Sequence, residues 1–302
     1  MLTKAIVRPP AANFAEGLTT ANLGAPDYER ALKQHEDYCA ALEQCGLTLT
    51  RLEADGRYPD STFVEDTAIL IGAPASAKTH PLTQVVLTKP QAVLTRPGAP
   101  SRSGEVESMR RVLADFFPSV GEIQSPGTLD GGDVCEAGNH FFIGISERTN
   151  EGGAQQLVEL LAPFGYTSSL VDITKSGTGV RGPRRGSPAG VLDPPVTHAQ
   201  DARATRHTLH LKTGLAYPDD SRLVVTEALA ACEEFRGYDL VRVNDGEEYA
   251  ANCIRVNDHV LVASGFPVLE RNLQALGYQT IALEMSEFQK MDGGLSCLSI
   301  RF

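Results

Sequence analysis

The 302-residue sequence lacks any uninterrupted apolar run that approaches the roughly 18 to 20 residues of a membrane-spanning helix. No signal peptide is visible, because Met1 leads almost directly into the segment KAIVRPP. Basic residues are in deficit, with 27 Lys and Arg against 38 Asp and Glu and a formal net charge of −11. Nucleic acid and anionic membranes are therefore poor partners, and a cationic small molecule is a suitable one. We expect a cytoplasmic protein that is monomeric or homodimeric.

Cysteine is scarce, with six residues and no Cys-x-x-Cys pair among them. This spacing disfavours a structural zinc site, and the low cysteine density of a long chain disfavours a disulfide framework. The sequence also lacks an HExxH motif and an Asp-rich loop with calcium spacing. We therefore expect six reduced thiols and no structural zinc site. The usual role of such a thiol is that of a small buried hydrophobe.

Hydrophobic residues make up 42% of the chain and charged residues 22%, which is enough for a sizeable core. The pattern alternates strand, helix, strand, which is typical of an α/β protein. Helical spacing predicts helices over 27–45, 104–117, 154–164 and 268–276. Apolar runs predict strands over 4–7, 47–54, 63–72, 92–96, 166–173 and 279–285, and hairpins over 132–146, 209–228 and 251–265.

Five short segments place polar or small residues just before an apolar strand, and we call them the strand-start motifs. They are Phe63–Asp66, Leu129–Asp133, Leu209–Lys212, Ala250–Cys253 and Asp292–Leu295. Recurrence at roughly 40 to 80 residues indicates modules that cannot bury their faces alone. Five such modules arranged radially would bring all five motifs to one axis. The alternative is an ordinary α+β sheet in which the turn chemistry is coincidental.

Two stretches interrupt this pattern. Residues 175–206 are rich in Gly and Pro and almost free of aliphatic residues, so burial cannot offset the entropy of ordering them. We expect a flexible, removable insertion there. A second, weaker insertion is expected over 73–91.

The strand-start motifs and their surroundings carry most of the chemistry-bearing side chains: Asp60, Glu65, Asp66, Asp130, Asp133, His210, Asp292 and Cys297. Carboxylates gathered near one axis repel one another unless a cation lies among them. A guanidinium is one such cation, because its planar N–H donors match carboxylates in fork geometry. A metal ion is the other, although the ligand set is poor for one. The alternative is that each carboxylate caps a turn.

Cys297 differs from the other cysteines because it follows Gly293-Gly294, close to the expected last strand. A thiol attacks as the thiolate, and a nearby histidine or bound cation favours that form. His210 is the histidine that lies in a strand-start motif. A Cys297–His210 pair would suit nucleophilic catalysis, with core packing as the alternative. Cys135 is the rival nucleophile.

Seven segments, taken in chain order, resemble the dimethylargininase family (dimethylarginine dimethylaminohydrolases). They are FVED (63–66), SR (101–102), LDGGDV (129–134), SERTN (146–150), LHLKTG (209–214), AANCI (250–254) and MDGGLSC (291–297). This family belongs to the guanidine-modifying enzymes with the five-bladed α/β-propeller (pentein) fold. The resemblance thus implies a single catalytic domain over residues 1–302, built from pseudo-fivefold ββαβ-type modules. Arginine deiminase and amidinotransferase are larger relatives, so the length favours dimethylargininase.

The resemblance also implies the catalytic residues. Cys297 matches the nucleophile, and His210 matches the general acid and base. Asp130 takes the position of the catalytic carboxylate, where members of the family carry either Glu or Asp. Asp66 resembles the second carboxylate that binds the guanidinium.

The substrate-binding residues follow from the same resemblance. Arg102 and Arg148 match the arginines that hold the substrate carboxylate, and Phe63 would lie near the methylated nitrogen. The remaining implied residues are Asp60, Glu65, Leu18 in the loop 17–24, which would act as a lid, and Met291, with Leu18 and Met291 acting through their backbones.

The implied reaction converts asymmetric dimethylarginine or monomethylarginine to citrulline and dimethylamine or methylamine, through a covalent thiouronium at Cys297. Two alternatives remain open: an arginine deiminase-type reaction on the same fold, and a module that binds an arginine derivative without turnover. A papain-like protease is disfavoured. Its nucleophile would precede the histidine and lie near the start of a helix, whereas Cys297 comes last and is expected on a strand.

Overall fold

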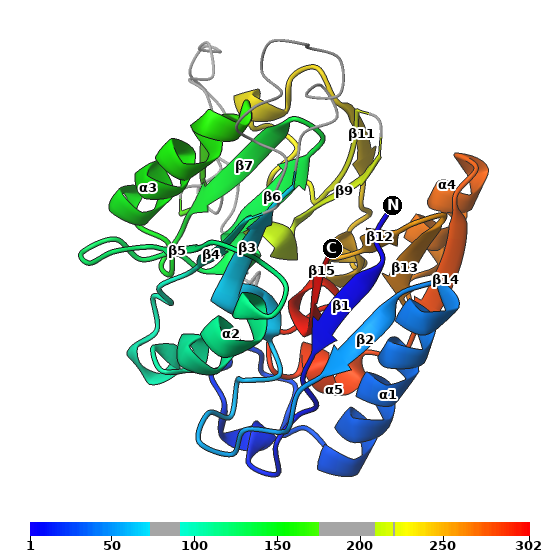
Figure 1. Ribbon diagram of the computed structural model, residues 1–302. Helices are drawn as coiled ribbons and strands as arrows, with labels where there is room; N and C mark the ends of the chain where they lie inside the picture. Colours follow the sequence, from blue (N-terminus) through cyan, green and yellow to red (C-terminus); the bar gives the residue numbers. More distant parts are fainter. Residues whose placement is uncertain (73–90, 175–208, 220) are drawn as a thin grey trace, which may run out of the picture.

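The computed structural model describes residues 1–72, 91–174, 209–219 and 221–302 (Figure 1). The expected insertion at 175–206 lies outside the described residues. The second one, at 73–91, does too, except for Gln91, which begins a strand. The structure therefore tests the body of the fold.

The strands of the described ranges form five three-stranded sheets. In every sheet the middle strand pairs antiparallel with one neighbour and parallel with the other. The sheets are β15 (Ser299–Arg301), β1 (Lys4–Val7) and β2 (Thr48–Arg51); β3 (Ala68–Ile71), β4 (Gln91–Leu94) and β5 (Val120–Glu122); β6 (Val134–Ala137), β7 (His140–Ile145) and β8 (Thr167–Asp172); β9 (Leu215–Asp219), β10 (Arg222–Val225) and β11 (Asp239–Arg242); β12 (Ile254–Val256), β13 (His259–Ala263) and β14 (Gln279–Leu283). One topology repeated in five sheets confirms the predicted five-bladed α/β-propeller.

A crossover joins the two parallel strands of each blade. The crossovers are helical: α1 (Tyr28–Gln44), α2 (Glu105–Ala114), α3 (Glu151–Leu161), the short η8 (Glu233–Phe235) and α4 (Pro267–Ala275). Figure 1 shows α1, α3 and α4 on the outside of the molecule. A further short helix, α5 (Ser286–Gln289), follows β14. Within the described ranges, no helix combines the length and apolar character needed to cross a membrane.

The helices form where the sequence provides a cap and an apolar face. The Asp27 side chain accepts the Arg30 N–H at the start of α1, and the Asn150 side chain accepts the Gly153 N–H at the start of α3. On α1 the inward face includes Tyr38, which is fully buried, and burying a large apolar side chain contributes about 1.5–3 kcal/mol. Each helix thus holds its sheet from outside and leaves the first strand of the blade free to face the axis.

The five strand-start motifs form short 3-10 helices or turns next to one another. These are η2 (Val64–Thr67), η5 (Gly131–Asp133), η7 (Leu211–Thr213), η9 (Glu248–Ala251) and η10 (Ser296–Leu298), and each is followed by the first strand of a blade. Hydrogen bonds connect neighbouring motifs around the axis. Three backbone N–H groups donate to side chains of the preceding motif: Gly132 to Asp66, Leu211 to Asp133 and Ser296 to Asn252. In addition, the Asn252 side chain donates to the Lys212 carbonyl, and the Ser296 hydroxyl donates to Glu65. The motifs therefore do meet at one axis.

Two predictions at the axis were wrong in detail. Residues 63–72 were expected as one strand, but Val64–Thr67 is a 3-10 helix and the strand begins at Ala68. Cys297 was expected on the last strand, but it lies in η10, before β15 begins at Ser299. In both cases the chain forms a short 3-10 turn at the axis before the first strand of the blade begins.

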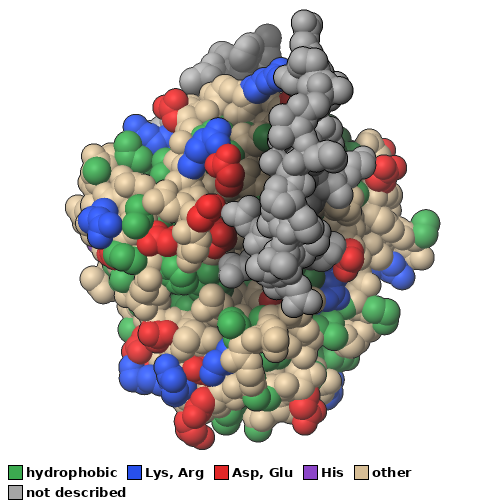
Figure 2. Space-filling view, turned by 180° about the vertical axis from the view of Figure 1, so that it is seen from behind, with side chains coloured by type: hydrophobic (Ala, Val, Ile, Leu, Met, Phe, Trp, Pro, Cys, Tyr) green, Lys and Arg blue, Asp and Glu red, His purple; other side chains and the backbone are tan. Residues whose placement is uncertain are grey.

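The rear of the molecule is an ordinary charged surface where the described residues form it. Figure 2, seen from behind, shows acidic and basic side chains interspersed around the grey segments.

Candidate active site

A cavity lies where the strand-start turns meet. It is lined by Leu18, Asp60, Phe63, Asp66, Arg102, Asp130, Arg148, Leu209, His210, Met291, Asp292, Gly293 and Cys297. Every residue implied by the sequence resemblance is in this set except Glu65. Side chains from opposite ends of the chain therefore converge on a single polar site.

Cys297 lies in the short turn η10 and is partly exposed. Its N–H donates to the Gly294 carbonyl at 3.2 Å. The preceding glycines are required by packing, because a Cβ on Gly293 would lie 2.2 Å from the Phe63 ring and one on Gly294 would lie 2.6 Å from Asn252. The Gly-Gly pair thus allows the turn that carries Cys297 to pack closely against Phe63 and Asn252.

The electrostatic surroundings keep the Cys297 thiol protonated in the free protein. Burial, together with the negative charges of Glu65 and Asp66, raises the pKa of the Cys297 thiol to about 12. A cation bound beside Asp66 would offset this effect. The rival cysteine, Cys135, is buried on β6 with a pKa raised to about 12 by burial, and it does not line the cavity.

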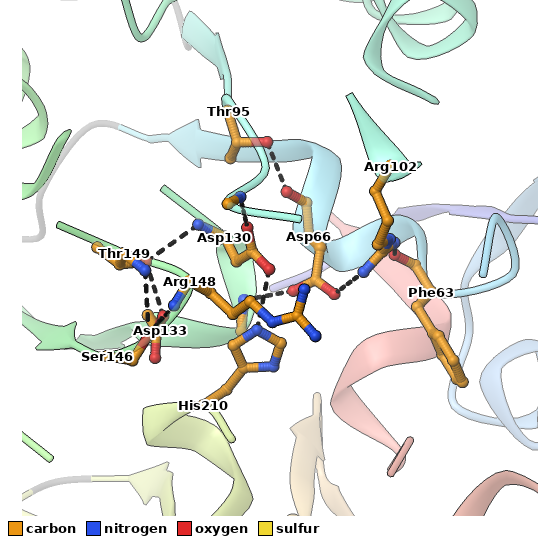
Figure 3. A network of polar contacts seen from close by, with 12 residues as sticks. Phe63, Asp66, Thr95, Arg102, Asp130, Asp133, Ser146, Arg148, Thr149 and His210 are labelled. Atoms are coloured by element: carbon orange, nitrogen blue, oxygen red, sulfur yellow. Dashed lines mark hydrogen bonds and ion pairs between the residues drawn. The ribbon is translucent and has the colours of Figure 1, made fainter. Parts of the chain in front are cut away.

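His210 forms an ion pair with Asp130. The two atoms that meet are Nε2 of His210 and Oδ2 of Asp130, 3.0 Å apart (Figure 3). Burial alone would lower the pKa of His210, but the charge of Asp66 and the hydrogen bond to Asp130 outweigh burial and raise the pKa to about 9. His210 is therefore an imidazolium at neutral pH. Gly132 lets the ring approach, since a Cβ there would lie 2.8 Å from it.

Asp66 is the second buried carboxylate of the cavity. Its Oδ1 accepts the Gly132 N–H at 2.8 Å, and its Oδ2 accepts Nη1 of Arg102 at 2.5 Å. Although burial opposes ionisation, the positive charges of His210 and Arg102 lower the pKa of Asp66. Asp66 is thus a fixed negative charge on the cavity wall.

The two predicted arginines have different environments. The Arg102 guanidinium is buried between Asp66 and Glu105, and its Nη2 also donates to the carbonyls of Asp60 and Phe63. The one Arg102 N–H with no partner in the described part of the chain is on Nη1. Arg148 makes no side-chain hydrogen bond or ion pair within the described ranges, and Figure 3 shows it extending toward Asp66 and His210. Among the described residues, Arg148 is therefore the arginine of this cavity whose side-chain donors have no bonded partner.

The loop 17–24 closes over the site through two carboxylates. Both oxygens of Asp60 accept the Leu18 N–H, at 3.0 and 3.2 Å. Asp292 accepts the N–H of Thr20 and the hydroxyls of Thr19 and Thr20. The sequence named Asp292 among the chemistry-bearing side chains near the axis, but it did not predict these bonds to the loop 17–24. Leu209 and Gly293 are the other lining residues that the sequence analysis did not assign to the site.

Glu65 is the one residue implied by the resemblance that does not line this cavity. Its carboxylate accepts Nζ of Lys212 and the Ser296 hydroxyl, both at 2.6 Å. It faces a second cavity, together with Lys212 and Arg301. Glu65 therefore supports the turn that carries Cys297 from behind.

One group of side chains has the composition of a metal site. Single ligand atoms of Asp66, Asp130 and His210 lie within 4.8 Å of one another. However, these groups already have partners, since His210 pairs with Asp130 and Arg102 binds one oxygen of Asp66. The arrangement fits an organic cation with N–H donors better than a metal ion.

Comparisons with known proteins were made by sequence and by structure. No family model matches the chain. The chain is 36% identical over 303 aligned residues to the N(G),N(G)-dimethylarginine dimethylaminohydrolase of Pseudomonas aeruginosa, with 100% of both chains covered. A solved structure of that protein, a cysteine-to-serine variant with citrulline, has a TM-score of 0.81 at 35% identity and covers 100% of both chains. The N-terminal domain of the arginine dihydrolase ArgZ from cyanobacteria shares the fold, with a TM-score of 0.72 at 15% identity over 100% of this chain and 98% of that one.

The fold and the site together define a pentein, a five-bladed α/β-propeller of the guanidine-modifying enzyme class. Within that class, the full-length identity is decisive. The chain belongs to the dimethylarginine dimethylaminohydrolase family, which agrees with the resemblance carried by the seven sequence segments.

Proposed function

We propose that this protein hydrolyses Nω-methylated arginines to citrulline, releasing dimethylamine or methylamine. The observation that carries this function is one cavity that brings together a thiol, an imidazolium and two buried carboxylates, those of Cys297, His210, Asp66 and Asp130. The relatives supply the substrate class, since they are named for dimethylarginine and one was solved with citrulline.

Substrate recognition divides into two ends. Asp66 and Asp130 bind the guanidinium as fixed acceptors and hold its plane beside the sulfur of Cys297. At the other end, Arg148 binds the substrate carboxylate. Arg102 contributes at most its remaining Nη1 N–H, because its other donors are already bonded.

The remaining substrate-binding residues close the cavity. Phe63 lines the cavity and gives the methyl groups an apolar contact. Asp60, with the backbones of Leu18 and Met291, surrounds the α-ammonium group beneath the loop 17–24, which acts as a lid. The substrate is thus read at its methyl groups, its guanidinium and its amino-acid end.

The first half-reaction breaks the bond to the methylated nitrogen. The bound guanidinium lowers the pKa of the Cys297 thiol, which loses its proton to solvent and attacks the guanidinium carbon. The His210 imidazolium then donates its proton to the methylated nitrogen. The C–N bond breaks, dimethylamine or methylamine leaves, and a thiouronium remains on Cys297.

The second half-reaction restores the enzyme. His210, now neutral, accepts a proton from a water molecule while the oxygen adds to the thiouronium carbon. The tetrahedral carbon then loses its hydroxyl proton as the C–S bond breaks, and the departing thiolate of Cys297 takes up that proton. Citrulline leaves, the thiol is restored, and His210 is again protonated. No step requires a metal or an organic cofactor. The partner implied is a small cationic amino acid, acted on by a monomer or homodimer.

The test is a product assay with asymmetric dimethylarginine, monomethylarginine and arginine as separate substrates. We expect citrulline in equal amount to dimethylamine or methylamine, detected by mass spectrometry, and little ammonia from arginine. Preferential release of ammonia from arginine would instead identify a deiminase. Stoichiometric binding of dimethylarginine without citrulline would identify a binding module.

A further inference from the structure

Asp133 is a fully buried carboxylate that does not line the active-site cavity. It is the second aspartate of the LDGGD segment, and the mechanism above does not use it. Its Oδ2 accepts the hydroxyls of Ser146 and Thr149, each at 2.6 Å, and its Oδ1 accepts the Leu211 N–H at 2.9 Å. Figure 3 shows this group beside Arg148 and Asp130.

Each of the three donors leads to a different part of the active site. The Ser146 hydroxyl in turn accepts the N–H groups of Arg148 and Thr149, both at 3.0 Å, and so shapes the turn that carries Arg148. The Thr149 hydroxyl accepts the Asp130 N–H at 3.1 Å. Leu211 directly follows His210 in the chain, so its N–H fixes the backbone that carries the imidazole.

We propose that Asp133 is a positioning residue that sets the placement of Arg148, Asp130 and His210 relative to one another. The inference rests on the proposed hydrolysis of methylarginines, because it assigns Arg148 to substrate binding and the Asp130–His210 pair to chemistry. Asp133 itself touches neither substrate nor reacting atoms.

A carboxylate is required at this position because all three partners are donors. An ionised carboxylate only accepts hydrogen bonds, so it satisfies the two hydroxyls and the amide at once. An asparagine of the same size would turn an N–H group toward either Leu211 or the hydroxyls and leave donors facing each other. Burial raises the pKa of Asp133 to about 6, so the group remains largely ionised at neutral pH.

The hydroxyls of Ser146 and Thr149 connect Asp133 to the backbone of the active site. Ser146 and Thr149 each donate to Asp133, which leaves their lone pairs free to accept backbone N–H groups. Without Asp133 the hydroxyls can rotate, and the backbone of Arg148 and of Asp130 loses an oriented acceptor. The Ser146 hydroxyl acts on Arg148, which binds the substrate, and the Thr149 hydroxyl acts on Asp130, which holds His210. Mutation of each hydroxyl should therefore affect a different kinetic constant.

The experiment compares Ser146→Ala and Thr149→Val with the wild type, using dimethylarginine and a methylguanidine that lacks the amino-acid end. Loss of one hydrogen bond of this kind changes a kinetic constant by about three- to tenfold. Ser146→Ala should raise KM for dimethylarginine by about that factor and leave methylguanidine turnover unchanged. Thr149→Val should lower kcat by about that factor for both substrates.

Asp133→Asn should combine both effects. Matched controls are Ser286→Ala and Thr280→Val, which also remove bonded hydroxyls but lie away from the cavity. Circular dichroism and thermal unfolding establish that each variant folds, and the two hydroxyl variants remain informative if Asp133→Asn does not fold. Equal losses of kcat/KM for both substrates in both hydroxyl variants, in proportion to lost stability, would overturn the proposal. Absence of any wild-type turnover of dimethylarginine would instead contradict the proposed function.

Discussion

The carboxylate of Asp130 orients His210 and is itself fixed by a second hydrogen bond. While Oδ2 of Asp130 meets Nε2 of His210 at 3.0 Å, its Oδ1 accepts the Gly98 N–H at 2.8 Å. The carboxylate therefore cannot rotate freely, and the imidazole is presented in one orientation. In the proposed reaction, a guanidinium bound between Asp66 and Asp130 would therefore meet an imidazolium that can donate its proton to the leaving amine.

Cys297→Ser is expected to abolish citrulline formation and to leave the fold intact. The hydroxyl is nearly isosteric with the thiol, but it does not ionise near neutral pH, whereas an ordinary cysteine titrates at about 8.5. The measurement is kcat with dimethylarginine, together with circular dichroism. Cys232→Ser is the matched control, because Cys232 is also partly exposed but lies outside the cavity. Retained activity in Cys297→Ser would reject the nucleophile.

Arg148→Ala should reduce kcat/KM for dimethylarginine about tenfold or more, and hardly affect an alkylguanidine. A charge-assisted hydrogen bond to the substrate carboxylate is worth about 1.5–3 kcal/mol, and an alkylguanidine has no carboxylate to lose. Steady-state kinetics on the two substrates measure the difference. Equal losses on both would mean that Arg148 does not bind the amino-acid end.

Arg102→Ala is expected to destabilise the protein rather than only weaken substrate binding. Removing the guanidinium leaves Asp66 and Glu105 as buried carboxylates without their cation, a change that costs about 3–5 kcal/mol. Urea denaturation of this variant should show the loss, and Arg148→Ala should show almost none. Similar unfolding midpoints for the two variants would contradict the buried role of Arg102.

Asp292→Gly should loosen the loop 17–24 and raise KM about three- to tenfold, because the loop loses the bonds from Thr19 and Thr20. Glycine suits this position, since Asp292 has a φ of 55°. The measurements are KM and the rate of limited proteolysis within the loop, both of which should rise in the variant. The control is Ser221→Gly, at another positive φ of 77° on a distant hairpin. A rise in KM of the same size in the control would show that the bonds between Asp292 and the loop do not control substrate binding.

Stability should fall as the pH rises through the range in which His210 titrates. The fold raises the pKa of His210 from 6.5 to about 9, so the protonated form stabilises the folded state fully below pH 6.5 and progressively less up to pH 9. The difference corresponds to at most about 3 kcal/mol in the free energy of unfolding. Urea titrations of the wild type and His210→Gln at pH 6 and pH 9 should converge at the higher pH. Curves that stay parallel would contradict the raised pKa.

The periodic parts of the fold were predictable from the sequence, and the less regular parts were not. The helix over 28–44 was marked by a cap at Asp27 and a stop at Gly46, and the hairpin β6–β7 by its Ala-Gly-Asn turn. The strands β5 and β11 were missed because each is three or four residues long and only partly buried. Short edge strands of this kind are defined by their partners rather than by their own pattern.

The site was predictable as a set of residues but not as a set of contacts. The seven segments pointed to the side chains around the cavity, yet nothing in the sequence distinguishes Arg102, buried in ion pairs, from Arg148, which has no side-chain partner in the described part of the chain. The cavity that Glu65 lines could not be predicted for a related reason. It adjoins Asp66 in the chain, but the 3-10 turn directs the two carboxylates into different cavities.

The pairing of β1 with β15 has a consequence for how activity arises during folding. The strand β15, which closes the propeller, directly follows the turn that carries Cys297. A chain in which the other four blades have assembled but β15 has not docked therefore holds His210, Asp66 and Asp130, and has no nucleophile in place. Catalysis is then the last property to be acquired and reports directly on ring closure. Refolding followed by citrulline production should lag behind refolding followed by circular dichroism, and the delay measures the docking of the C-terminal strand.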